Sequence, residues 1–278
     1  MSTVETNGIE TYYKREGDGP PVILVHGGNS DLQLWQHQVD GLVDDYEVIR
    51  YDLRGHGRTG GSDIDRYSVG LFADDLYALV EELGLETPRI CGLSLGGMTA
   101  LTYAARYPDD ISALAVAGAP TPEFPSVKER VLRLGLGRVV LTLIDVVGYE
   151  RIQSANEWIA ERFGEDVDEV KDEATKLREE TFETDPDEYT KILRAVNTYS
   201  QTPIVMENIN VPTLVLYGEE EPFIESHLPV YRRRIPDVVV REIPDAGHNS
   251  HIQNPDAFTR AIREFFDEQV SMEKVVDS

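Results

Sequence analysis

Short apolar runs alternate with longer stretches of helical pattern along most of this chain of 278 residues. Six of the runs have the length and composition of buried strands, and they span residues 21–25, 47–51, 89–91, 113–117, 213–217 and 238–243. Helical stretches include residues 69–83 and 256–270, and the second has an amphipathic spacing of its large apolar side chains. The alternation predicts an α/β fold, with a mostly parallel central sheet flanked by helices on both faces.

Beyond Pro120 the pattern changes, because helical stretches follow one another without strands between them and charged residues become frequent. Strand-like runs return after Asn210. We therefore expect an α/β core of residues 1–120 and 205–278 with an inserted helical cap of residues 121–204. Apolar residues near the start of this cap fit either a substrate pocket or packing under the cap, and packing is the commoner fate of such a stripe. They are Val131, Leu132, Leu134, Leu136, Val139, Val140, Leu141 and Leu143.

Residues 92–96 read Gly-Leu-Ser-Leu-Gly and lie directly between the apolar run at 89–91 and the helical stretch 97–105. A serine in a G-x-S-x-G turn between strand and helix is the pattern of a nucleophile elbow, in which a strained backbone raises the hydroxyl of Ser94 above the sheet. Small residues are needed on both sides because strand and helix cross closely there. Whether Ser94 is a nucleophile or part of a plain glycine-rich turn depends on whether the chain also supplies the partner residues that a nucleophilic serine requires.

A serine hydroxyl needs a neighbouring base that takes its proton as it attacks. Of the six histidines, His248 is the best placed, because it follows the run at 238–243 and a Pro-Asp-Ala-Gly turn and so lies on a loop beyond a strand end. His251, three residues later, is the nearest alternative. The other four fit hydrogen-bonded structural roles, and they are His26, His37, His56 and His227.

The third member of such a set is an acid that fixes the tautomer of the imidazole and stabilises its charged form. In this chain order the acid is expected between the serine and the histidine. The buried run at 213–217 ends in a glycine, the glutamates Glu219, Glu220 and Glu221, and a proline. The acid is expected among these three glutamates.

The chain resembles members of the α/β-hydrolase fold superfamily over most of residues 20–120 and 205–270. Four motifs carry the resemblance, and together they are far more specific than any one of them. They are His26-Gly27-Gly28, which resembles the family's oxyanion-hole loop; the Asp-Leu-Arg-Gly-His-Gly turn at 52–57; the elbow at 92–96; and the Gly247-His248 pair.

The resemblance implies which glutamate acts. The family's acid usually stands fourth in a G-x-x-D-P-like turn, and that position is Glu221 here, with glutamate in place of the usual aspartate. Because the extra methylene displaces the carboxylate, Glu219 and Glu220 remain alternatives. Glu123 is a weaker candidate, since some relatives place the acid one strand earlier.

The mechanism implied is acyl transfer to water through an acyl-enzyme. Ser94 attacks a carbonyl, His248 shuttles the proton and a glutamate orients the imidazole. By resemblance, the backbone N–H groups of Gly28 and Leu95 hold the developing oxyanion. Because haloalkane dehalogenases and epoxide hydrolases of this fold use an aspartate at the elbow, the serine argues against both activities.

We therefore expect a serine hydrolase acting on a small-molecule carboxylic ester or lactone. The elbow sequence is shared with other members of the superfamily, so a carbon–carbon bond hydrolase and a cofactor-free haloperoxidase or perhydrolase remain alternatives. A further alternative is a non-catalytic receptor that uses the pocket for binding alone.

The formal net charge is −25, from 51 acidic and 26 basic residues, and only six of the basic residues are lysines. An acidic, lysine-poor surface resembles proteins adapted to concentrated salt, where screening reduces self-repulsion, so we predict stability that rises with salt. The charge argues against nucleic-acid and anionic-membrane partners, which require cationic surfaces. The basic run at 232–234 is expected to pair with nearby carboxylates.

A single cysteine, Cys91, excludes an intrachain disulfide, and its place before the elbow predicts a buried and unreactive thiol. Residues 1–19 are polar and lack the hydrophobic segment of a signal peptide, so a cytoplasmic location is expected. No spacing of His, Cys or carboxylates indicates a metal, and Gly27-Gly28 lacks the lysine of a phosphate loop, so no cofactor is expected.

Overall fold

The computed structural model of the chain describes residues 2–131, 134–135, 139, 167–182 and 185–276. Their centre is an eight-stranded sheet with the order β1-β2-β4-β3-β5-β6-β7-β8. The strands are β1 (Ser2–Thr6), β2 (Ile9–Glu16), β3 (Pro21–Val25), β4 (Glu47–Tyr51), β5 (Arg89–Leu93), β6 (Ala113–Ala117), β7 (Thr213–Gly218) and β8 (Val238–Ile243). Strands β3 to β8 pair in parallel, whereas β2 pairs antiparallel with both β1 and β4. The predicted mostly parallel sheet is confirmed.

The six strands predicted from apolar runs are all present, and only β5 and β7 extend beyond the expected ends. The N-terminal hairpin of β1 and β2 was not predicted, because its strands lie at the sheet edge and carry many polar residues. Its turn is Asn7-Gly8, with positive φ at both residues (44° and 78°). An Asn-Gly pair between strand-like segments is a strong hairpin signal, so the sequence did contain the information.

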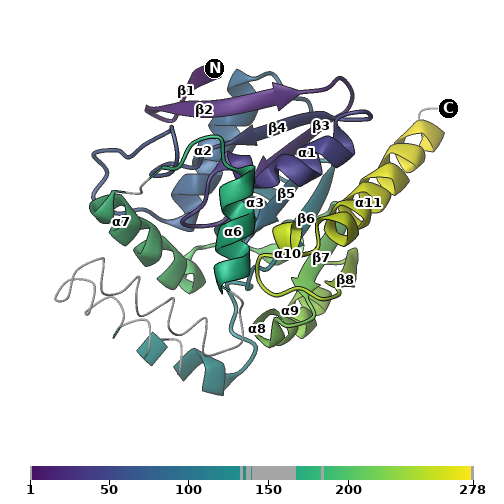
Figure 1. Cartoon of the computed structure of the whole chain (residues 1–278). Coiled ribbons are helices and arrows are strands. Elements are labelled where there is room, and N and C mark those ends of the chain that lie inside the picture. Colours follow the sequence, from purple (N-terminus) through teal and green to yellow (C-terminus); the bar gives the residue numbers. More distant parts are fainter. Residues whose placement is uncertain (1, 132–133, 136–138, 140–166, 183–184, 277–278) are drawn as a thin grey trace.

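Helices cover both faces of the sheet (Figure 1). Ile23 and Val25 of β3 share a core cluster with α2 and α3, whereas Val22 and Leu24 of the same strand share a second cluster with α1 and α11. This is the alternation that a strand buried on both faces requires. The helices outside residues 121–204 are α1 (Gln36–Leu42), α2 (Val69–Glu82), α3 (Leu95–Arg106), α8 (Pro222–Glu225), α9 (Leu228–Arg234), α10 (Ser250–Gln253) and α11 (Pro255–Val276), with a 3₁₀ turn η1 (Leu32–Trp35) before α1.

Between β6 and β7 the described residues form helical elements and no strand. These elements include α6 (Val167–Leu177), α7 (Pro186–Asn197), η2 (Tyr199–Gln201) and η3 (Met206–Asn208). The division into a core of 1–120 and 205–278 and a cap of 121–204 stays a prediction, and we refer to residues 121–204 as the predicted cap. Of the apolar residues named near its start, Val131, Leu134 and Val139 are exposed, and the other five lie outside the described residues.

Candidate active site

Ser94 occupies the turn between β5 and α3, with φ 54° and ψ −116°. Such a conformation is rare for a residue with a side chain and stores strain. Two hydrogen bonds hold it: the Ser94 N–H donates to the carbonyl of Ala117 on β6 (2.8 Å), and its own carbonyl accepts from Met98 (2.9 Å). A Cβ on Gly96 would overlap the carbonyl oxygen of Val25, so glycine is required there. The strained strand-turn-helix geometry predicted from the sequence is present.

His248 and Glu221 meet although they are 27 residues apart in the sequence. Nδ1 of His248 lies 2.5 Å from Oε1 of Glu221, and the carboxylate side chain is 8 % exposed against 34 % for the imidazole. Because the ionised carboxylate can only accept, Nδ1–H donates to it and Nε2 becomes the basic nitrogen of the ring. This is the tautomer that a general base for a serine needs.

The sheet order puts the three candidate residues at one edge of the sheet. Ser94, Glu221 and His248 follow β5, β7 and β8, and parallel strands end at the same edge of a sheet. Strand β6 lies between β5 and β7 and is followed by Gly118, which has φ +54°. A Cβ on Gly118 would lie 3.2 Å from Nδ1 of His248 and 3.4 Å from Oε1 of Glu221. Gly118 therefore makes room for the pair, and the sequence reasoning missed it.

The other candidate acids lie elsewhere. Glu219 and Glu220 are exposed, and Oε2 of Glu219 accepts a hydrogen bond from the backbone N–H of Asp245 (3.2 Å). Glu123 forms ion pairs with two arginines of α9, at 2.6 and 2.7 Å. The geometry thus brings Glu221 alone of these four glutamates into contact with His248.

The two residues expected to supply oxyanion donors, Gly28 and Leu95, lie next to each other. Leu95 is the first residue of α3, so its N–H is one of the donors that have no partner within the helix. A Cβ on Gly28 would lie 3.8 Å from the side chain of Leu95 and 3.8 Å from Ile192 of α7. Ile192, which the sequence reasoning also missed, is 2 % exposed and gives this part of the site an apolar wall.

Two buried histidines hold the loop that carries Gly28. Nδ1 of His26 lies 2.7 Å from the carbonyl of Gly27, while its Nε2 accepts from the N–H of Leu53 (3.0 Å). Nε2 of His56 accepts from the N–H of Asn29 (3.3 Å). Burial is the main cause that lowers the pKa of His26 to about 4 and that of His56 to about 3. Both rings are therefore neutral near pH 7 and can serve as these acceptors.

The remaining histidines have partners away from Glu221. His251 packs against Trp35, with ring centroids 4.8 Å apart, and burial lowers its pKa to about 3, which makes it a poor base. His37 lies 3.5 Å from Glu173, and the buried His227 lies 3.0 Å from Glu129. The hydrogen-bonded role expected for His227 agrees with its contact, whereas Nε2 of His37 has no hydrogen-bond partner among the described residues.

The thiol of Cys91 is fully buried, and burial raises its pKa well above the usual range, as expected for an unreactive cysteine. Within the described ranges, no three His, Cys, Asp or Glu side chains are grouped as a metal site requires. No described helix has both the length and the apolar composition needed to cross a bilayer. In the basic run, Arg233 pairs with Glu123 and Arg234 with Glu123 and Glu207, as the sequence predicted.

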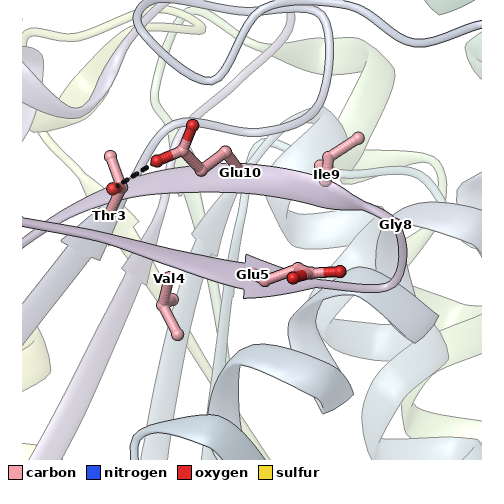
Figure 2. A pocket seen from close by; sticks show the side chains of 6 residues that line it. All are labelled: Thr3, Val4, Glu5, Gly8, Ile9 and Glu10. Atoms are coloured by element: carbon pink, nitrogen blue, oxygen red, sulfur yellow. Dashed lines mark hydrogen bonds between the residues drawn. The ribbon is translucent and has the colours of Figure 1, made fainter.

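A surface hollow of about 420 Å³ lies on the β1–β2 hairpin (Figure 2). Its polar lining consists of Thr3, Glu5 and Glu10, and the hydroxyl of Thr3 donates to Glu10 (2.7 Å). The hollow is at the edge of the sheet, and β4 and β3 separate its hairpin from β5. Its two carboxylates and its hydroxyl therefore lie away from the elbow of Ser94.

Comparison with known proteins agrees with the fold. The model of the alpha/beta hydrolase fold family matches residues 20–255. The solved structure of an enol-lactonase from Burkholderia xenovorans LB400 is similar, with a TM-score of 0.77 and 25 % identity over 96 % of this chain and 100 % of that one. A thermophilic esterase from Thermogutta terrifontis gives 0.75 and 27 % over 96 % and 98 %.

Not all similar proteins act on esters. Epoxide hydrolase 3 of Xenopus tropicalis is 25 % identical over 285 residues, which cover 95 % of this chain and 77 % of that protein. The family match, spanning most of the chain, nevertheless agrees with the eight-stranded sheet. The chain therefore belongs to the α/β-hydrolase fold family, and it is a hydrolase of that fold.

Proposed function

We propose that this hydrolase cleaves a small carboxylic ester or a lactone through an acyl-enzyme, with Ser94 as nucleophile, His248 as base and Glu221 as acid. The observation that carries the proposal is the 2.5 Å contact between His248 and the buried Glu221, which follow β8 and β7 at the sheet edge where the strained elbow of Ser94 follows β5. The resemblance of the chain to an enol-lactonase and an esterase supports the same bond type.

In the first half-reaction, Nε2 of His248 takes the hydroxyl proton of Ser94 while Oγ bonds to the carbonyl carbon. The carbonyl π electrons move to oxygen, where the N–H groups of Gly28 and Leu95 stabilise the negative charge. The tetrahedral species collapses, the C–O bond of the ester breaks, and His248 returns the proton to the leaving alkoxide. In a lactone the alkoxide stays attached to the acyl group.

In the second half-reaction, water replaces Ser94 as the attacking group. His248 takes a proton from the water, the hydroxide oxygen bonds to the acyl carbon, and the bond to Oγ breaks as the proton passes to Ser94. Glu221 keeps the imidazole oriented and stabilises its positive charge in both halves. The carboxylic acid leaves, and the enzyme returns to its starting state.

The elbow residue separates this proposal from epoxide hydrolysis. Epoxide hydrolases of this fold carry an aspartate at the elbow, and this chain has Ser94 there. Ile192 and Leu95 line the space beside Gly28. Their apolar side chains would favour an apolar acyl group in the acyl-enzyme.

The test is hydrolysis of p-nitrophenyl esters from acetate to palmitate, measured at low salt and in molar KCl. We expect turnover with the wild type, a preference for short chains, and loss of turnover in Ser94→Ala. Labelling by a fluorophosphonate probe should follow the same pattern, because the probe reacts with activated serines. Ser226→Ala, which removes an exposed serine hydroxyl, is the matched control and should behave as the wild type.

Three results would contradict the proposal. Turnover that persists in Ser94→Ala would mean that another group is the nucleophile. Absence of both turnover and labelling at either salt concentration would favour a non-catalytic receptor. Labelling of Ser94 without ester turnover would instead favour a carbon–carbon bond hydrolase or a perhydrolase, which need other substrates.

A further inference from the structure

Three consecutive residues of the predicted cap, directly after α6, each form an ion pair with a different part of the core. Arg178 lies 2.8 Å from Asp31, Glu179 lies 3.4 Å from Lys14, and Glu180 lies 2.6 Å from Arg58. The pair of Arg178 differs from the other two because its acidic partner, Asp31, is only 4 % exposed. Glu179, in contrast, is 76 % exposed, and exposed pairs contribute little.

The backbone of the same segment is held by one side chain of the core. Oε1 of Gln33 accepts from the N–H of Glu179 (2.7 Å) and of Glu180 (3.2 Å), and its Nε2 donates to the carbonyl of Glu180 (2.9 Å). Gln33 is 8 % exposed. The segment 178–180 is thus fixed in register on η1.

Asp31 links this contact to the oxyanion-hole loop, because it ends the loop that starts at His26 and begins η1. Its Oδ1 accepts from the backbone N–H of Gln33 (2.9 Å), while Oδ2 accepts from Nε of Arg178 (2.8 Å). The carboxylate of Asp31 therefore serves as the N-cap of η1 and also pairs with Arg178 of the predicted cap. Gly28 lies three residues before Asp31 on the same loop.

A second buried carboxylate lies next to the first. Asp52 accepts from the N–H of Leu32 (2.8 Å), the first residue of η1, and is 1 % exposed. Burial raises the pKa of Asp52 to about 6, and the negative charge of Asp31 adds to this effect. The positive charge of Arg178 also reaches His26, where it adds to the lowering of the pKa by burial. Arg178 therefore pairs with one of two neighbouring buried acids, Asp31, at the end of the loop.

We propose that Arg178 is a positioning residue for the oxyanion hole, which acts by neutralising Asp31 and so keeps η1 and the loop 26–31 in place. The importance of Gly28 in this inference rests on the proposed function. Without Arg178, the buried carboxylate of Asp31 loses its ion-pair partner and keeps a like charge beside it, which is a costly arrangement. Moving η1 and its loop toward water relieves that cost and displaces the Gly28 N–H.

The first test does not depend on catalysis. It measures amide hydrogen exchange of the peptide 26–31 in Arg178→Met, which removes the charge and keeps an unbranched apolar side chain. We expect exchange at least about tenfold faster than in the wild type, since local opening becomes easier. Arg178→Lys should stay close to the wild type. Glu179→Gln, which breaks the neighbouring exposed pair and leaves the bonds to Gln33 intact, is the matched control and should not change exchange.

A double variant tests the physical cause. In Asp31→Asn with Arg178→Met, the buried charge is absent together with its partner, and the introduced asparagine keeps an oxygen that can cap η1. Protection of the loop should return toward the wild-type level. If the single variant Arg178→Met leaves exchange unchanged, or if the double variant is worse than the single one, the inference is wrong.

The second test measures rates, at a temperature where melting curves show every variant folded. For a short p-nitrophenyl ester, kcat of Arg178→Met should fall about tenfold or more with a smaller change in KM, because a displaced donor acts in the transition state. An effect on KM alone would show that the predicted cap only retains substrate and would overturn the positioning role. If the wild type itself shows neither turnover nor labelling, the proposed function fails, while the exchange measurements still decide the coupling.

Discussion

The prediction most directly tied to the site is the effect of Glu221→Gln. Glutamine keeps the size of the side chain and removes its charge. It can still present an oxygen to Nδ1–H of His248, so the orientation of the ring can survive while the stabilisation of the imidazolium is lost. Glu219→Gln and Glu220→Gln make the same chemical change at exposed positions of the same turn and are the matched controls.

The magnitude follows from the geometry of the pair. The 2.5 Å contact between Nδ1 and Oε1 places the centres of charge about 4 Å apart, and at an effective dielectric constant of about 20 this gives roughly 4 kcal/mol of attraction. The attraction exists only when His248 is charged, which happens as it takes the serine proton. Because about 1.4 kcal/mol corresponds to a factor of ten, kcat should fall about a thousandfold.

The assay is kcat and KM for a short p-nitrophenyl ester across pH, with melting temperature as a control for folding. Glu221→Gln should lower kcat far more than it changes KM. Glu219→Gln and Glu220→Gln should stay within about twofold of the wild type, as surface changes usually do. Equal losses in Glu221→Gln and Glu219→Gln would refute the assignment of the acid, and a loss of less than tenfold in Glu221→Gln would refute the electrostatic argument.

Two further predictions concern stability. With a net charge of −25, the melting temperature should rise between dilute buffer and molar KCl, where the Debye length falls to about 3 Å, and a fall would contradict the salt-adapted interpretation. Because burial lowers the pKa of His26 to about 4 and those of His56 and His251 to about 3, the folded state binds fewer protons than the unfolded state below pH 6.5, and stability is lost as the pH falls. Asp52, with its pKa raised to about 6, opposes this with one proton, so these three histidines and Asp52 together contribute an uptake of about two protons on unfolding near pH 5. The slope of unfolding free energy against pH in molar KCl measures the total uptake, to which these groups contribute. His251→Gln should reduce it by about one, and stability that increases from pH 7 to pH 5 would contradict the sign.

Much of the fold could be predicted because its signals are local. A buried parallel strand is an uninterrupted apolar run, and β3, β4, β6 and β8 have the ends that their sequences indicated. The β1–β2 hairpin was missed because an edge strand is half exposed and lacks such a run, although Asn7-Gly8 marked its turn. The end of α11 was also misjudged, since the helix continues past the amphipathic phenylalanines to Val276.

In the candidate site, too, the features that depend on neighbouring residues could be predicted and the others could not. The elbow is specified within a few residues, because Gly92 and Gly96 are required by the crossing of strand and helix around Ser94 itself. The choice among three adjacent glutamates is not local. Resemblance favoured Glu221, and the structure places this residue against His248 while Glu219 faces solvent.

The sequence by itself determined the sheet, the serine elbow and the set of residues from which partners are drawn, because each depends on neighbours in the chain. Only the tertiary structure decided which partners meet. Gly118 lies next to His248 and Glu221 because β6, which it follows, lies between β5 and β7. Arg178 contacts Asp31 although the two are 147 residues apart in the sequence. Such contacts depend on the packing of distant segments and on the burial of charge, and neither leaves a pattern in the order of residues along the chain.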